Sequence, residues 1–113
     1  MLIPNADRAT IEPAQLRDYL LSSAHPIGRF KARFFVALGF TADRWAELAE
    51  ALQIQHLTQD AEPTPTTVQG QKYTIRAILN GPTGQSATVV SVWFIPTRGD
   101  VPRFVTAYPG DGL

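Results

Sequence analysis

The sequence predicts an α+β fold, in which N-terminal helices pack on one face of a C-terminal antiparallel sheet of three or four strands. Apolar residues recur at helical spacing in the first half of the chain, and apolar and polar residues alternate in the second half. A segment rich in Thr, Pro and Gln separates the halves. The 113 residues suffice for one hydrophobic core, so we expect a single domain. It comprises a helical half (about 1–57), a loop (about 58–70) and a strand-rich half (about 71–109).

Three helices are expected in the helical half. The first spans about residues 13–22, because Pro13 suits a first helical turn. The second begins at or beside His25-Pro26 and ends at Gly39, and the third runs from about Ala42 to His56. The apolar stripes that define the three helices are Leu16-Tyr19-Leu20, Ile27-Phe30-Phe34-Leu38 and Trp45-Leu48-Leu52.

Three strands are expected in the second half, at about Lys72–Asn80, Ser86–Ile95 and Arg103–Tyr108. Turn-forming residues fill the two intervals between them, at 80–85 and 96–102. In the first strand, the residues expected to face the core are Tyr73, Ile75, Ala77 and Leu79. These strands predict an antiparallel meander.

Composition excludes several kinds of site. The absence of cysteine excludes disulfides, thiolate zinc sites and a cysteine nucleophile. The two histidines are not paired and no carboxylate cluster is present, so we expect no metal site and no other cofactor. Neither a signal peptide nor a run of roughly 20 apolar residues is visible, which predicts a cytoplasmic protein without a membrane partner.

The charges are balanced overall but unevenly distributed. A formal net charge of zero argues against indiscriminate nucleic-acid binding. Residues 26–42 and 63–99, however, contain cations and no acidic residue, and acids gather between them. The gathered acids are Asp43, Glu47, Glu50, Asp60 and Glu62. This pattern favours a cationic face and an acidic back, although ordinary scattered surface charge is the alternative.

The second expected helix has the composition of an anion site at its start. His25 precedes the first turn, where free N–H groups and the helix dipole favour a phosphate. Gly28, Arg29 and Arg33 follow as candidate phosphate-binding residues. Helix projection puts Lys31 at the edge of the apolar stripe, pointing along the boundary between helix and sheet. The alternatives are a helix cap or a turn residue at His25, and a lysine stem that covers apolar surface while its head reaches water.

The strands offer a second set of phosphate-binding side chains. Arg76 and Arg103 provide guanidinium groups that suit phosphoryl oxygens, and Lys72 adds another cation. Thr106 and Tyr108 share one face of the last strand, and their hydroxyls can donate or relay protons. The alternatives are simple β-propensity for Thr106 and a core aromatic ring for Tyr108. His56, at the end of the third helix, is interpreted as a cation that interacts with the helix dipole.

Several segments resemble a bacterial domain family of unknown function. The segments are Leu2-Ile3-Pro4-Asn5-Ala6, the eleven residues from His25 to Phe35, Tyr73-Thr74-Ile75 and the seven residues from Arg103 to Pro109. That family is more distantly similar to toxin ribonucleases grouped with barnase, the colicin tRNases and RelE. The resemblance implies helices before an antiparallel sheet, with catalytic residues drawn from a helical His or Lys and from later strands. The ending Thr-x-Tyr-Pro of that group corresponds to Thr106, Tyr108 and Pro109.

Together these observations lead to the hypothesis of a metal-independent endoribonuclease of bacterial toxin type, with RNA as substrate. His25 or Lys31 would be general base or acid, Arg76 and Arg103 would stabilise the phosphorane, and Tyr108 would be a second proton-transfer group. The rival is a non-catalytic interaction module, such as an antitoxin, an immunity protein or a small subunit. A small-anion binder is a third interpretation. A toxin would also have a cognate antitoxin or immunity protein as partner.

Overall fold

The computed structural model describes residues 1–22, 24 and 28–110, and the side chains of all of these except residues 28–30. The helical segments are η1 (Ala6–Arg8), α1 (Pro13–Gln15), η2 (Leu16–Leu20), α2 (Gly28–Ala37), η3 (Ala42–Arg44), α3 (Trp45–Ala51) and η4 (Leu52–His56). α1 and η2 form the first expected helix, and η3, α3 and η4 form the third. Both are confirmed, although η2 and η4 are π-helical turns. The predicted start of the second helix at His25-Pro26 lies outside the described residues.

The sheet is a four-stranded antiparallel meander. Its strands are β1 (Glu62–Pro63), β2 (Gly70–Asn80), β3 (Ser86–Pro96) and β4 (Arg103–Pro109). They lie in the order β1-β2-β3-β4. The expected α+β class and the three longer strands are therefore confirmed. β1 was not expected, because a strand of two residues is too short to show any periodicity. Its residues pair with Thr74 and Tyr73 of β2.

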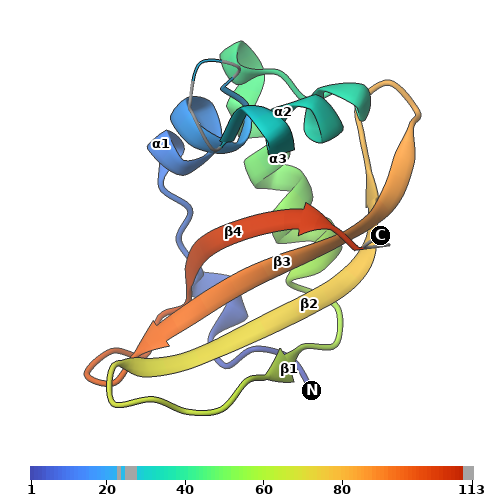
Figure 1. Cartoon of the computed structure of the whole chain (residues 1–113). Helices are drawn as coiled ribbons and strands as arrows, with labels where there is room; N and C mark the ends of the chain where they lie inside the picture. Colours follow the sequence, from blue (N-terminus) through green and yellow to red (C-terminus); the bar gives the residue numbers. More distant parts are fainter. Residues whose placement is uncertain (23, 25–27, 111–113) are drawn as a thin grey trace.

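The helices occupy two positions around the sheet. Figure 1 shows η4 behind the sheet, with α3 leading down to it, whereas α1 and α2 lie beyond β4. The core fills the space between these layers, and its largest fully buried side chains include Trp93, Phe35, Phe40 and Phe104. The four residues of β2 expected to face the core all contact it, Ala77 from a partly buried position. The opposite face of the sheet is left without a helix over it (Figure 1).

Two glycines fit the end of α2 against the β2–β3 turn. Gly39 follows the helix with φ of 100°, a left-handed conformation that glycine adopts without strain, as the predicted helix stop requires. At Gly81, in the turn, an added Cβ would lie only 1.6 Å from the Leu38 carbonyl oxygen. The two backbones are therefore in direct contact, which fixes α2 relative to the sheet.

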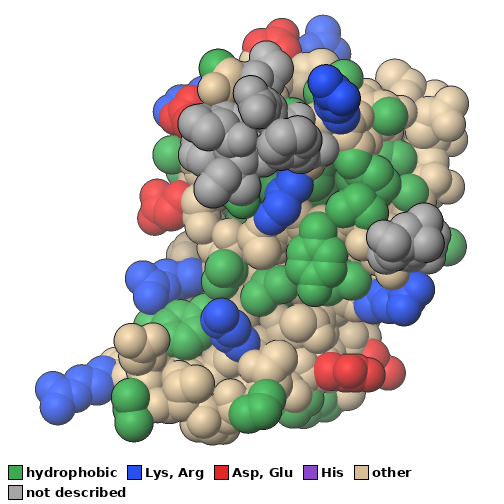
Figure 2. Space-filling model, viewed as in Figure 1, with side chains coloured by type: hydrophobic (Ala, Val, Ile, Leu, Met, Phe, Trp, Pro, Cys, Tyr) green, Lys and Arg blue, Asp and Glu red, His purple; other side chains and the backbone are tan. Residues whose placement is uncertain are grey.

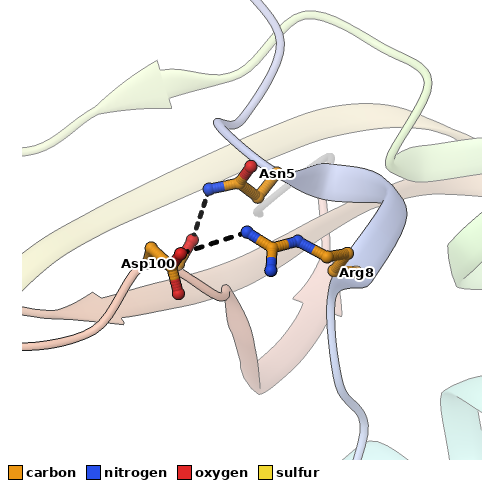
Figure 3. A network of polar contacts seen from close by, with 3 residues as sticks. All are labelled: Asn5, Arg8 and Asp100. Carbon is orange, nitrogen blue, oxygen red and sulfur yellow. Dashed lines mark hydrogen bonds and ion pairs between the residues drawn. The ribbon is translucent and has the colours of Figure 1, made fainter.

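A small polar network ties the N-terminal segment to the β3–β4 loop (Figure 3). Asn5 Nδ2 donates to the Asp100 carbonyl oxygen at 2.7 Å, and Arg8 Nη2 pairs with Asp100 Oδ2 at 3.1 Å. Asn5 has φ of 58°, which asparagine tolerates better than most residues. Because Arg8 and Asp100 are both exposed, their ion pair contributes at most about 1 kcal/mol. Its main effect is to fix the position of the loop that leads into β4.

Candidate phosphate site on the open face of the sheet

Lys31 connects the helices to the last strand. Its ammonium group donates to Thr106 Oγ1 at 2.9 Å and to Tyr19 Oη at 3.2 Å, and it lies 5.3 Å from the centre of the Tyr19 ring. This is the boundary position that helix projection predicts. Within the described part of the chain, Lys31 has no carboxylate partner. A half-buried ammonium group whose described partners are hydroxyl groups and an aromatic ring can still bind an external anion.

The strand register arranges the other candidates in three cross-strand rows on the open face. The rows are Lys72–Phe94–Arg103, Thr74–Val92–Thr106 and Arg76–Val90–Tyr108. Thr106, and with it the Lys31 ammonium, belongs to the middle row. Tyr108 is two residues further along β4 on the same face, because side chains alternate along a strand. The rows place Thr106 and Tyr108 on one surface with Arg76.

A pocket of about 400 Å³ opens beside the last of these rows. Arg76 and Tyr108 both line it. Thr74 of β2 and Val90 of β3 also contribute to the lining. Asp60 and Glu62, from the segment before β2, complete the lining. The expected separation of a cationic face from an acidic back is therefore incomplete, because β1 carries Glu62 to the rim of the open face. The sequence could not show this, since β1 was not foreseen.

Arg103 lies apart from Arg76 and Tyr108. It lines another pocket, of about 240 Å³, at the far row of the open face. Its guanidinium group lies 5.9 Å from the centre of the Phe94 ring. A β-bulge between Val92 and Trp93 shifts the register of β4 just where Arg103 enters the sheet. The structure thus brings Lys31, Thr106, Tyr108 and Arg76 to one region, with Arg103 at its margin.

The remaining predicted residues are more scattered. Gly28 is the first residue of α2, Arg33 is exposed on that helix, and Lys72 is exposed at the start of β2. His25 and the side chain of Arg29 lie outside what the structure describes. Figure 2 shows the open face with Lys and Arg side chains spaced among hydrophobic ones, and with acidic side chains at its margins. Such a surface combines attraction for an anionic ligand with apolar contact area.

A buried polar chain on the core side of the sheet was missed by the sequence interpretation. Trp93 Nε1 donates to Ser91 Oγ at 2.9 Å, and Ser91 Oγ lies 2.8 Å from His56 Nδ1. His56 Nε2 lies 3.2 Å from the carbonyl oxygen of Ala77, which can only accept a hydrogen bond. The Nε2–H tautomer satisfies every member of the chain, with Ser91 donating to Nδ1. Burial lowers the pKa of His56, against the opposing effect of the Ala77 carbonyl, so its interpretation as a helix-end cation is wrong.

The neutral His56 ring predicts a pH-dependent loss of stability. Because its pKa is lower in the folded chain than in the unfolded chain, the unfolded chain takes up the proton first as pH falls. The contribution of His56 to the free energy of unfolding is complete above its pKa in the unfolded chain, about 6.5, and declines below that pH. We expect urea unfolding to show a free energy that falls between about pH 7 and pH 5. A His56→Gln variant should lose less stability over that range; an equal loss in both proteins would contradict the assignment.

The fold and the open face define a small α+β protein with a cationic and aromatic sheet surface. The chain belongs to the family described as a domain of unknown function, DUF6883, whose sequence model matches residues 2–111. No curated protein matches the sequence. A solved structure of a contact-dependent growth inhibition toxin–immunity protein complex from Klebsiella pneumoniae 342 contains a chain of similar fold. That chain aligns with a TM-score of 0.68 and 20% identity, over 96% of this chain and 98% of its own length.

Two negative findings concern the described residues. None of the helices is long and apolar enough to cross a membrane. In the same part of the chain, no group of three or more His, Asp or Glu side chains is placed to hold a metal ion.

Proposed function

We propose that this protein is the toxin component of a bacterial toxin–immunity system and acts as a metal-independent endoribonuclease. The observation that carries the proposal is the Lys31 ammonium group, hydrogen-bonded to Thr106 on the open face of β4. Tyr108 lies on the same face of this strand, and Arg76 lines a pocket with it. These are the groups that a phosphodiester needs: a cation, hydroxyls and a guanidinium group.

The chemistry would be attack of a ribose 2′-hydroxyl on the adjacent phosphate. Lys31 would stabilise charge on the phosphorane or exchange a proton with the reacting oxygens, and Arg76 would bind its equatorial oxygens. Tyr108 would be a second proton-transfer group, and His25 remains a proposed general base or acid. Arg103, which the sequence hypothesis assigned to the phosphorane, is better placed for a neighbouring part of the RNA. Such an enzyme would act on cytoplasmic RNA and would be held inactive by a cognate immunity protein.

The comparisons support the toxin–immunity setting through the fold. The neighbouring structure is a complex of a toxin with an immunity protein, and the similarity extends over nearly the full length of both aligned chains. Three features favour the toxin role: the open face, the hydrogen bond of Lys31 to Thr106, and the Thr-x-Tyr-Pro ending of β4.

The second candidate is a non-catalytic immunity or antitoxin protein. It is favoured by hydrophobic side chains that are exposed on the same face, notably Ile78 at 60% and Tyr108 at 39%. A protein partner would cover such side chains on binding. Under this alternative, the open face would bind a protein and have no reaction of its own.

A cleavage assay distinguishes the two candidates. We expect the purified protein to cut total RNA, with tRNA included, in the presence of EDTA, because the proposed acids and bases are all side chains. The products are to be followed by gel electrophoresis over time, with heat-denatured protein as the control for contaminating nuclease.

Two results would contradict the proposal. Cleavage that requires a divalent cation would overturn the mechanism. Failure to cut any RNA, together with tight binding of the protein encoded by a neighbouring gene, would establish the interaction module instead.

A further inference from the structure

The pocket beside Phe94 has a chemistry of its own. It holds an aromatic ring and the Arg103 guanidinium group, with Glu12 and Gln15 from the α1 region along its wall. The Phe94 ring is fixed against Gly70, where an added Cβ would lie 2.6 Å from the ring's Cζ atom. Arg103 lies over the same ring. The pocket is therefore walled by a positioned ring and a planar cation, which are the two surfaces on which unstacked nucleobases are held in proteins.

Two residues with hydrogen-bond acceptors line the same pocket. Glu12 is exposed at the start of α1, and its carboxylate makes no capping bond to the helix. Gln15 Nε2 donates to the carbonyl oxygen of Val105, which leaves the amide oxygen without a partner in the described part of the chain. These acceptors suit a base that carries an exocyclic amino group. Arg103 supplies a donor for the base's own acceptors.

The position of the pocket relates it to the proposed phosphate site. Phe94 and Arg103 occupy the row next to the one that contains Thr106, which is hydrogen-bonded to Lys31. Two residues along a strand correspond to roughly 6–7 Å. This separation is about one nucleotide along an extended strand, so a base attached near a phosphate at Lys31 could reach the ring.

We propose that the Phe94–Arg103 pocket is a nucleobase subsite, which receives an unpaired, amino-bearing base next to the phosphate bound at Lys31. The inference rests on the proposed ribonuclease function and adds a substrate class to it: single-stranded RNA with guanine, adenine or cytosine at this position, in preference to uracil. Paired bases are excluded, because a base in a duplex is stacked on its neighbours and has no free face.

The test is a binding experiment that needs no cleavage. Fluorescently labelled five-nucleotide RNAs, with 2′-O-methyl groups to prevent reaction, are titrated with wild type, Phe94→Leu, Glu12→Gln and Arg44→Gln. Arg44→Gln is the charge control, because it removes an exposed cation from η3, which lines neither of the two pockets on the open face. Thermal melting of each variant checks that it is folded.

We expect wild type to bind the amino-bearing oligomers more tightly than oligouridine or a duplex. Phe94→Leu should weaken binding of the former by about tenfold, in keeping with the loss of one stacked base. Glu12→Gln should reduce the preference of the protein for the amino-bearing oligomers over oligouridine. Arg44→Gln should differ little from wild type.

The outcomes separate the subsite from the ribonuclease proposal. If wild type cleaves ordinary RNA but folded Phe94→Leu binds every oligomer as wild type does, the subsite is wrong and the nuclease stands. If wild type cleaves nothing but its binding depends on Phe94, the nuclease is wrong and the subsite stands. If no oligomer binds, both are wrong.

Discussion

Replacing Lys31 by methionine is expected to lower kcat/KM for RNA cleavage by on the order of 10²–10³-fold. The ammonium group donates to Thr106 and Tyr19 and has no carboxylate partner in the described chain, so its charge is available to the reacting phosphate. Methionine keeps most of the apolar stem, and we therefore expect thermal stability to change little. Initial rates on a defined RNA, with the melting temperature of each protein, measure both effects.

Arg98→Met is a suitable control for this substitution. Arg98 is an exposed cation in the loop that connects β3 and β4, outside the proposed site. The control should keep its rate within a few-fold of wild type. A folded Lys31→Met protein with wild-type activity would remove Lys31 from the mechanism.

Ser91→Ala is expected to lower the free energy of unfolding by about 2–6 kcal/mol. The hydroxyl group accepts from Trp93 Nε1 and donates to His56 Nδ1, and all three side chains are fully buried. Alanine would leave a donor and an acceptor buried without their partner, each at a cost of about 1–3 kcal/mol. The loss would be a large part of the roughly 5–15 kcal/mol that is usual for a small protein.

Urea denaturation at pH 7 measures this loss, and Ser86→Ala provides the matched control. Ser86 begins the same strand but is exposed, so its substitution should change stability by no more than about 0.5 kcal/mol. Equal stabilities for the two variants would show that the buried chain contributes nothing.

The elements that could be predicted from the sequence are those with a strong local pattern. The alternation of Tyr73, Ile75 and Leu79 predicts both strand β2 and its buried face. β1 escaped prediction because it exists only through its pairing with Tyr73 and Thr74. The π-helical turns at η2 and η4 could not be predicted either, because apolar periodicity does not distinguish a π-helical turn from an α-helix.

The candidate site was predictable in its residue types but not in its layout. Helix projection places Lys31 at the helix–sheet boundary, where it meets Thr106. The distance of Arg103 from Tyr108 depends on strand register and on the bulge in β3–β4, which are set by pairing between distant segments. His56 was misread because its burial depends on Ser91 and Ala77, far away in the chain.

The chemical nature of the RNA ends left by cleavage tests the central claim most directly. Internal attack by the 2′-hydroxyl at a metal-free Lys31–Thr106–Tyr108 site predicts a 2′,3′-cyclic phosphate on one fragment and a 5′-hydroxyl on the other. Mass spectrometry of a short defined RNA, cut in the presence of EDTA, identifies both ends. Fragments with a 3′-hydroxyl and a 5′-phosphate would instead show attack by water and would contradict the account.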